Sequence, residues 1–328
     1  MTPTLAAALL LLGAPAPADS ARGRADTATV PFEYEDARVY VPVAVGPLAR
    51  EWFILDTGAE PTVVDVGLAA RLGARVGGQE SVTGAGTGRL AQGWATGVRL
   101  RVGGAPLTPA RVAVSAIDSL LSPFTGRRAP GIVGSQFFRE HVVALDFGAR
   151  TLRVLPASGY RYTGRGAVLP LRLVGGVPLV DGVLTAPDGR RLPVRLLVDL
   201  GAKATLLVSE PFVERHHLRD AFPRRVRAPL GAGVGGETRY DFARVPRLEV
   251  GGDGGVAADS LVAGLSAEGT LRATWYDALL GAEFLARYGV VFDYARGRVI
   301  LEPRAPAPPP AAYDMSGAFL VARVTRRP

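Results

Sequence analysis

The 328-residue sequence predicts a mainly β fold made of two related lobes. Three observations lead to this prediction. Apolar and polar residues alternate with the period of a β-strand in many short segments, the helical patterns are few and short, and a set of sequence landmarks occurs twice in the same order. Because 48% of the residues are apolar, the chain has enough of them to form a core in each lobe.

The strand prediction rests on alternation bounded by turn residues. The alternation is clearest in residues 39–45, 98–102, 151–155 and 298–301. Helical periodicity is limited to residues 66–72, 211–217 and 282–287. None of these helical segments is long enough to connect neighbouring parallel strands, which favours a mainly β body.

The clearest part of the repeat surrounds Asp56 and Asp199. Residues 54–64, Ile-Leu-Asp-Thr-Gly-Ala-Glu-Pro-Thr-Val-Val, align without a gap with residues 197–207, Leu-Val-Asp-Leu-Gly-Ala-Lys-Ala-Thr-Leu-Leu. In each half a glycine-rich turn follows, at 84–88 and 231–236, and then an apolar-apolar-Gly segment, at 131–138 and 278–285. This order predicts two homologous lobes, residues 19–160 and 161–303, each large enough for its own core.

Both ends of the chain differ from the lobes. Residues 1–18 contain an apolar run at 5–12 followed by small residues, which predicts a signal peptide cleaved before Asp19 and export to the periplasm, the cell envelope or the extracellular space. The run is too short to span a bilayer, so no stable membrane insertion is expected after its removal. Residues 304–312 are rich in Pro and Ala and predict an extended linker, and residues 313–328 form a short tail.

The composition excludes several kinds of site. The chain has no cysteine, which rules out disulfides, a thiol nucleophile and a Cys-based metal site. Its net charge of +8 comes almost wholly from dispersed arginines, without the basic stripe and interleaved aromatic residues typical of nucleic-acid binding. With only three histidines, no metal site is expected. Residues 231–236 match the dinucleotide-binding glycine pattern, but a strand pattern follows, so no nucleotide cofactor is expected.

The repeated landmarks carry a family resemblance. Over residues 28–303, in both halves, the sequence resembles the retropepsin-like and pepsin-like aspartic peptidases, in their bacterial, two-lobed, single-chain form. The resemblance implies a mainly β fold of two closed-sheet acid-protease lobes that face each other across a cleft, with few short helices. It also implies a peptide or protein substrate, no cofactor and a monomeric protein.

The resemblance also assigns roles to the residues that match the motif. Asp56 and Asp199 are expected to be the catalytic carboxylates, one from each lobe. The residues expected to support the two catalytic loops are Thr57, Gly58, Leu200 and Gly201. The residues expected to contact substrate, several of them in hairpins that act as flaps, are Glu60, Lys203, Gly84, Gly86, Gly88, Gly231, Gly233 and Gly235. An alternative for Glu60 and Lys203 is that they cap their loops or pair with each other.

Two facing aspartates suit hydrolysis of a peptide bond. Carboxylates a few ångström apart cannot both ionise easily, so the pair holds one proton between them at moderately acidic pH. One carboxylate then takes a proton from a water, and the other donates a proton to the peptide carbonyl that the water attacks. Glycine two positions after each Asp suits a loop whose backbone approaches closely and turns sharply.

Position 200 departs from the family pattern. The family has Thr there, which hydrogen-bonds across to the opposite lobe, and Leu200 cannot make this bond. We therefore keep three hypotheses: an aspartic endopeptidase, a catalytically impaired peptide-binding protein (a pseudopeptidase) that binds extended peptides by strand addition, and a scaffold for a missing domain. The third hypothesis rests on residues 313–321, which resemble the opening strand of the PDZ-like domains that follow some bacterial aspartic peptidases.

Overall fold

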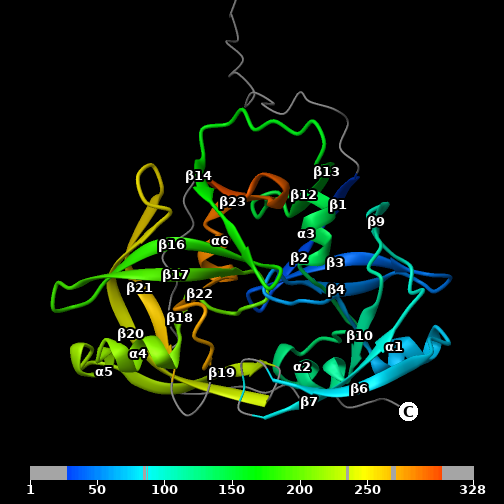
Figure 1. Cartoon of the computed structure of the whole chain (residues 1–328), viewed down its shortest axis with the longest axis horizontal. Coiled ribbons are helices and arrows are strands. Elements are labelled where there is room, and N and C mark those ends of the chain that lie inside the picture. The colour runs from blue at the N-terminus through cyan, green and yellow to red at the C-terminus, as the bar shows by residue number, and fades with distance from the viewer. Residues whose placement is uncertain (1–27, 84–85, 87, 234–235, 267–270, 305–328) are drawn as a thin grey trace, which may run out of the picture.

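The computed structural model describes residues 28–83, 86, 88–233, 236–266 and 271–304. The predicted signal peptide, the predicted tail and all of the predicted linker except Arg304 lie outside these residues. The described residues form three β-sheets with short helices beside them (Figure 1). The predicted mainly β fold is confirmed.

The first half of the chain forms a 10-stranded sheet in the order β6-β7-β10-β5-β11-β4-β3-β8-β9, with β2 paired to β3. Its strands are β2 (Glu33–Glu35), β3 (Arg38–Val45), β4 (Glu51–Leu55), β5 (Val63–Asp65), β6 (Val76–Val82), β7 (Leu90–Ala95), β8 (Leu100–Val102), β9 (Ala105–Leu107), β10 (Val112–Ser115) and β11 (Gly131–Val133).

The second half forms an 8-stranded sheet in the order β15-β16-β17-β22-β18-β21-β20-β19, and an additional pairing of β16 with β20 closes it on itself. Its strands are β15 (Arg172–Val174), β16 (Val177–Thr185), β17 (Arg191–Asp199), β18 (Leu206–Val208), β19 (Val226–Gly233), β20 (Gly236–Val250), β21 (Val256–Ser266) and β22 (Ala278–Gly281).

A third sheet joins the two halves, in the order β1-β13-β12-β23-β24-β14. Its strands are β1 (Ala28–Pro31), β12 (His141–Asp146), β13 (Thr151–Pro156), β14 (Ala167–Pro170), β23 (Tyr288–Asp293) and β24 (Arg298–Pro303). The halves meet where β12 and β23 pair antiparallel, with Val143 opposite Phe292. In Figure 1 this sheet lies above the other two, in the upper middle of the view. The lobes are therefore fixed to each other by hydrogen-bonded strands.

The same strand pairings surround Asp56 and Asp199. β4 runs parallel to β11, and β17 runs parallel to β22. After Asp56, strand β5 pairs antiparallel with β11 and parallel with β10. After Asp199, strand β18 pairs in the same way with β22 and β21. Asp56 thus follows, and Asp199 ends, a central strand of its own sheet, which is a rigid position for a functional side chain.

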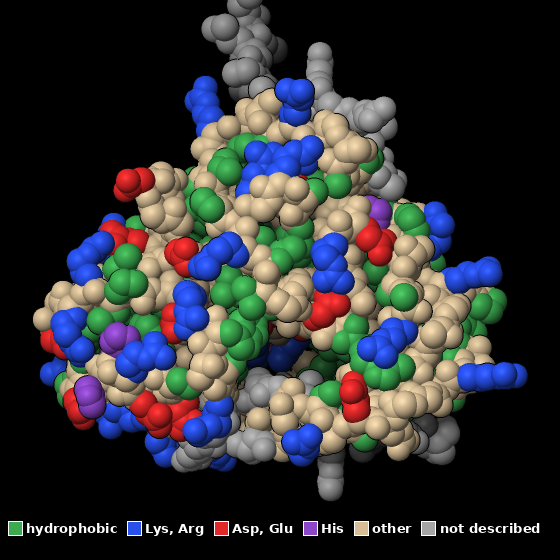
Figure 2. All heavy atoms as spheres, in the orientation of Figure 1, with side chains coloured by type: hydrophobic (Ala, Val, Ile, Leu, Met, Phe, Trp, Pro, Cys, Tyr) green, Lys and Arg blue, Asp and Glu red, His purple; other side chains and the backbone are tan. Residues whose placement is uncertain are grey.

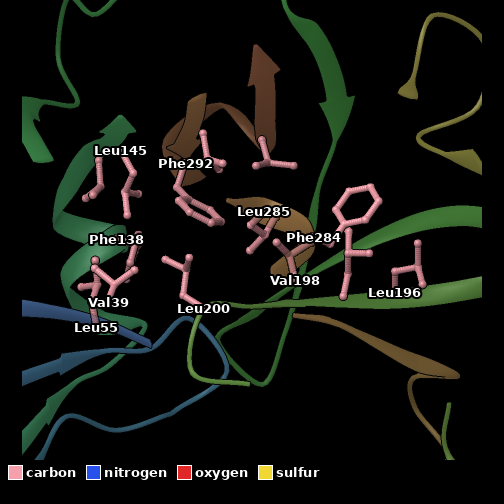
Figure 3. Close-up of a cluster of buried hydrophobic side chains, with 14 of the residues drawn as sticks. Val39, Leu55, Phe138, Leu145, Leu196, Val198, Leu200, Phe284, Leu285 and Phe292 are labelled. Atoms are coloured by element: carbon pink, nitrogen blue, oxygen red, sulfur yellow. The ribbon is translucent and has the colours of Figure 1, made fainter. Parts of the chain in front are cut away.

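Some strands do not alternate between buried and exposed residues as expected, because the core covers both of their faces. In β3 only Ala44 is exposed, because both faces of the strand are covered. One large cluster of buried residues includes apolar side chains from all three sheets, such as Leu55, Leu196 and Phe292. Figure 3 shows Leu200 within this cluster, pointing toward Phe138 and Phe292.

The predicted strands agree with the structure at residues 39–45, 151–155 and 298–301, which lie in β3, β13 and β24. The strand predicted at 98–102 begins only at Leu100, in β8. The three predicted helices correspond to α1 (Val66–Arg71), α4 (Glu210–Arg215) and α6 (Ala282–Leu285). The structure adds α2 (Ile117–Thr125), α3 (Gln136–Glu140), α5 (Leu218–Ala221) and the 3-10 turn η1 (Tyr294–Arg296).

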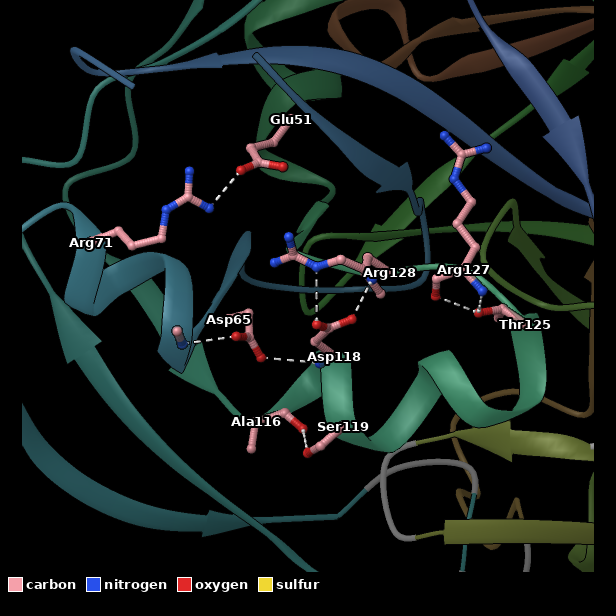
Figure 4. Close-up of polar contacts among 11 residues, drawn as sticks. Glu51, Asp65, Arg71, Ala116, Asp118, Ser119, Thr125, Arg127 and Arg128 are labelled. Carbon is pink, nitrogen blue, oxygen red and sulfur yellow. Dashed lines mark hydrogen bonds and ion pairs between the residues drawn. The ribbon is translucent and has the colours of Figure 1, made fainter. Parts of the chain in front are cut away.

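Helix α2 is held by contacts that are distant in sequence (Figure 4). The Asp65 carboxylate accepts from the backbone N–H of Gly67 at 2.8 Å, which caps α1, and from that of Asp118 at 3.0 Å, in the first turn of α2. The Asp118 carboxylate in turn accepts from the N–H of Ala129 at 2.8 Å. The apolar residues Ile117, Leu120, Leu121 and Phe124 have helical spacing, but Pro123 inside α2 lowers the helical propensity of the segment, and no helix was predicted there.

Candidate active site

Asp56 and Asp199 occupy equivalent loops at the ends of β4 and β17. The Asp56 N–H donates to the carbonyl oxygen of Val133 at 3.0 Å, and Asp199 lies opposite Gly281 in the parallel pairing of β17 with β22. In each loop one carboxylate oxygen accepts two backbone N–H groups, at 2.8 and 3.0 Å for Asp56 Oδ1 and at 2.8 and 3.2 Å for Asp199 Oδ1. These bonds fix the direction in which both carboxylates point.

The two loops face each other so closely that only glycine fits two positions after each aspartate. A Cβ on Gly58 would lie 2.7 Å from the Asp199 carboxylate carbon, and a Cβ on Gly201 would lie 2.2 Å from Asp56 Oδ2. Neither glycine has a positive φ, so the predicted need for a special turn is not the reason for them. The reason is that each loop touches the carboxylate of the opposite lobe.

The surroundings of the two carboxyl groups favour their protonated forms to different degrees. Burial raises the pKa of Asp56, against the lowering effect of its hydrogen bonds to Asp199 and to the loop N–H groups. Burial raises the pKa of Asp199 well above its usual value, and the nearby charge of Asp56 raises it further. The pair is therefore suited to hold one proton between its two carboxyl groups.

Thr57 makes the cross-lobe hydrogen bonds. Its Oγ1 donates to the carbonyl oxygen of Val198 at 2.7 Å and accepts from the N–H of Leu200 at 3.0 Å. Leu200 makes no reciprocal side-chain bond, as expected, and its fully buried side chain packs in the core. The Thr57 side chain thus joins the two aspartate loops by hydrogen bonds.

The glycines of the apolar-apolar-Gly segments pack directly behind the catalytic loops. A Cβ on Gly134 would lie 2.8 Å from the carbonyl oxygen of Ala59, and one on Gly281 would lie 2.2 Å from that of Ala204. Thr62 supports the first loop, because its Oγ1 accepts from the N–H of Gly134 at 3.1 Å. The equivalent Thr205 instead donates to Glu283 at 3.0 Å.

Glu60 and Lys203 both line the cleft, but they have different partners and do not pair with each other. Glu60 accepts two hydrogen bonds from Arg139, at 2.8 and 3.1 Å, within its own half. Lys203 donates to Asp36, which belongs to the opposite half. The other carboxylate oxygen of Asp36 accepts from Arg38 at 2.5 Å.

The cleft has a volume of ≈ 420 Å³ and includes both carboxylates and parts of both glycine-rich hairpins. The space-filling view shows a hollow between the first and the second half of the chain, in the lower part of the view (Figure 2). Of the glycines predicted to contact substrate, Gly231 and Gly233 line the cleft. Gly86 and Gly88 are described but are not among its lining residues, and Gly84 and Gly235 lie outside the described residues.

Several cleft residues were not predicted from the sequence. Arg38 is 6% exposed yet lines the cleft, and Ser115 and Ile117 come from β10 and the start of α2. Apolar walls flank the dyad on both sides; they are formed by Val63, Leu90, Ile132, Leu207, Leu230, Tyr240 and Leu279. Val63, Ile132, Leu207 and Leu279 belong to the repeated sequence segments, whereas no local motif marks the other cleft residues, which are Arg38, Leu90, Ser115, Ile117, Leu230 and Tyr240.

Among the described residues, no group of three or more His, Cys, Asp or Glu side chains could hold a metal ion. In the same part of the chain, every helix is too short or too polar to cross a bilayer.

Comparisons with known proteins agree with this geometry. Residues 41–137 match a family model described as aspartyl protease. A search of curated proteins found no match. Among solved structures, the fold is similar to an aspartic proteinase from Irpex lacteus, with a TM-score of 0.51, 15% sequence identity, and coverage of 84% of this chain and 97% of that chain. The sequence match in the first half and the shared fold support an aspartic peptidase family for this chain.

Proposed function

We propose that the protein is an aspartic endopeptidase that hydrolyses peptide bonds with a water activated between Asp56 and Asp199. One observation carries the proposal most directly: each catalytic loop approaches the opposite carboxylate so closely that a Cβ on Gly58 or Gly201 would collide with it. Two carboxyl groups brought together in this way share a proton, which is the arrangement that acid–base hydrolysis by a dyad requires.

In the proposed mechanism the two carboxyl groups take different roles. Asp199, whose pKa is raised by burial and by the charge of Asp56, holds the shared proton. Asp56 is the base that takes a proton from the water as it attacks the carbonyl carbon, and Asp199 donates its proton to the developing oxyanion. Collapse of the tetrahedral intermediate then breaks the C–N bond: the leaving amine takes the proton that Asp56 holds, and a hydroxyl of the intermediate returns its proton to Asp199 as the new carboxylic acid forms.

The proposed substrate is an extended peptide segment within a peptide or protein. The apolar cleft walls on both sides of the dyad can bury side chains that flank the scissile bond. The hairpins β6–β7 and β19–β20 contribute residues to the same cleft and supply strand edges for backbone hydrogen bonds.

The test is cleavage of a mixed peptide library from pH 3 to 7 by the wild-type protein and by Asp56→Asn. We expect Asp56→Asn to lower the cleavage rate by about 10² to 10⁴-fold, as is typical for removal of a general base. Asp181→Asn is the matched control, because Asp181 is an exposed carboxylate paired with Arg172 on the surface. Cleavage that persists in Asp56→Asn would contradict the proposal.

A second candidate function, peptide binding without efficient hydrolysis, is favoured by Leu200. The missing reciprocal bond would loosen the Asp199 loop, and a displacement of about 1 Å can cost on the order of a hundredfold in rate. A wild-type protein that binds peptides without cleaving them, and that gains cleavage in Leu200→Thr, would support this function over the first.

We also propose that the protein acts outside the cytoplasm, on the basis of the predicted signal peptide at residues 1–18. The test is N-terminal sequencing of the protein recovered from the cell envelope or medium, with Asp19 as the expected first residue. A chain that keeps residues 1–18 in the cytoplasmic fraction would contradict it.

A further inference from the structure

An ionic contact crosses between the lobes beside the dyad. Asp36 belongs to the first half and accepts from Lys203, which lies four residues after Asp199 in the second catalytic loop. Asp36 also pairs with Arg38 at 2.5 Å. The exposed fractions of the side chains are 23% for Asp36, 8% for Arg38 and 31% for Lys203, so water only partly screens the contact.

The backbone places Asp36 for this contact. Strands β2 and β3 are joined by Asp36 and Ala37, with φ values of +48° and +52°. Two consecutive residues with positive φ form a tight hairpin turn that usually contains glycine or asparagine, and alanine there is strained. The same hairpin makes another cross-lobe bond, because the Tyr34 hydroxyl donates to the carbonyl oxygen of Ala282 at 3.3 Å.

The two halves differ at this contact, as they differ at the residue after each aspartate, which is Thr57 in the first half and Leu200 in the second. Glu60, the counterpart of Lys203, pairs with Arg139 of its own half. The turn near Glu60 on the opposite lobe is Gly175-Gly176, between β15 and β16, and it has no side chain to form an ion pair. Among the residues that the structure describes, a cross-lobe ion pair therefore reaches only the second aspartate loop, in which Leu200 stands where the resembled family has a hydrogen-bonding threonine.

We propose that Asp36 is a positioning residue that holds the Asp199 loop against the first lobe through Lys203, in place of the cross-lobe hydrogen bond that Leu200 cannot make. This inference rests on the proposed peptidase function. Asp36 touches neither carboxylate of the dyad in this role, and it acts through the loop that carries Asp199.

The test is steady-state kinetics of Lys203→Met and Lys203→Arg on a peptide that the wild type cleaves. We expect Lys203→Met to lower kcat on the order of 10- to 100-fold with little change in KM, because a displaced carboxylate impairs chemistry more than binding. Lys203→Arg keeps the charge and is expected to retain most of kcat. The matched control is Arg172→Met, which breaks the exposed ion pair with Asp181 and is expected to leave kcat unchanged.

The Leu200→Thr background provides a second test. If the ion pair substitutes for the missing hydrogen bond, Lys203→Met should lower kcat at least several-fold less in Leu200→Thr than in wild type. An equal loss in both backgrounds, or a Lys203→Met enzyme as active as wild type, would overturn the inference while leaving the peptidase function intact.

A readout without turnover separates the two proposals. Pepstatin, a peptide inhibitor whose hydroxyl takes the place of the attacking water, can be titrated by calorimetry into each variant. A wild type that binds pepstatin but cleaves nothing refutes the peptidase function, and a weaker Kd in Lys203→Met, restored in Lys203→Arg, still supports the bridge. A wild type that neither cleaves peptides nor binds pepstatin refutes both.

Discussion

Thr57 accepts a hydrogen bond from the backbone N–H of Leu200 at 3.0 Å, although the two residues are 143 positions apart in the chain. The same hydroxyl donates to Val198, so one buried side chain satisfies a donor and an acceptor of the opposite catalytic loop. In the resembled family two threonines make the cross-lobe hydrogen bonds, whereas here the Thr57 hydroxyl makes them alone. The side chain at position 57 is therefore more important for joining the two loops than the side chain at position 200.

Thr57→Val should therefore destabilise the protein strongly. Valine keeps the shape of threonine but leaves the Val198 carbonyl and the Leu200 N–H without partners, at about 1 to 3 kcal/mol for each unsatisfied buried group. We expect the free energy of unfolding to fall by about 2 to 4 kcal/mol in chemical denaturation, with loss of peptidase activity. Thr57→Ser, which keeps the hydroxyl, is the control, and equal stability of Thr57→Val and wild type would contradict this account.

Leu200→Thr should also lower the free energy of unfolding, here because apolar packing is lost. Leu200 is fully buried among apolar side chains such as Phe138 and Phe292, so threonine there removes apolar contacts and introduces a hydroxyl. We expect a loss of about 1 to 3 kcal/mol in the free energy of unfolding. The matched control is Leu173→Thr on the exposed strand β15, expected within about 0.5 kcal/mol of wild type. A Leu200→Thr protein as stable as the control would show that threonine regains a hydrogen bond there.

The two aspartate loops were predictable because their determinants are local and occur twice. An apolar strand, an aspartate and a glycine two positions later are contiguous in sequence, and the second copy confirms which residues to compare. The bulk of the β structure was predictable for a similar reason, since alternation reports directly on strands. β3 shows the limit of that signal, because both of its faces are buried and its alternation carries little information about exposure.

The remainder of the site depends on contacts between distant segments. Helix α2 contains Pro123 and is stabilised by Asp65, more than fifty positions away, so local propensity argues against it. Asp36 and Lys203 meet only because the two lobes are joined through β12 and β23. One sequence supplies no signal for such pairings, and the alternative partners considered for Lys203 did not include Asp36.

Gly201→Ala should abolish activity without unfolding the protein. The added Cβ would lie 2.2 Å from Asp56 Oδ2, so the two catalytic loops would have to separate. A displacement of about 1 Å predicts a loss on the order of a hundredfold or more in kcat. Gly77→Ala is the matched control, because a Cβ on Gly77 in β6 would have no neighbouring atom within 4 Å, and Gly77 has no positive φ. Activity of Gly201→Ala within a few-fold of this control would contradict the close approach of the loops.

The pKa directions predict opposite pH dependences of stability for two aspartates. Burial raises the pKa of Asp199 in the folded protein, so its contribution to stability is fully present below its usual pKa of 3.8 and is lost as the pH rises through the folded value. Asp199→Asn, which mimics the protonated form, should therefore become more stable than wild type as the pH rises from acidic to neutral. By contrast, the hydrogen bond from Arg227 lowers the pKa of Asp241, whose contribution is present above 3.8 and is lost as the pH falls.

Chemical denaturation across this pH range measures both effects, with Asp241→Asn as the comparison. Asp241→Asn should be less stable than wild type at neutral pH, and the difference should shrink toward acidic pH, because protonation removes the same charge that the substitution removes. For Asp199→Asn the difference should have the opposite sign at neutral pH and also vanish in acid. If Asp199→Asn were instead destabilised at neutral pH, the carboxylate would be stabilised in its ionised form, and Asp199 could not be the proton donor of the dyad.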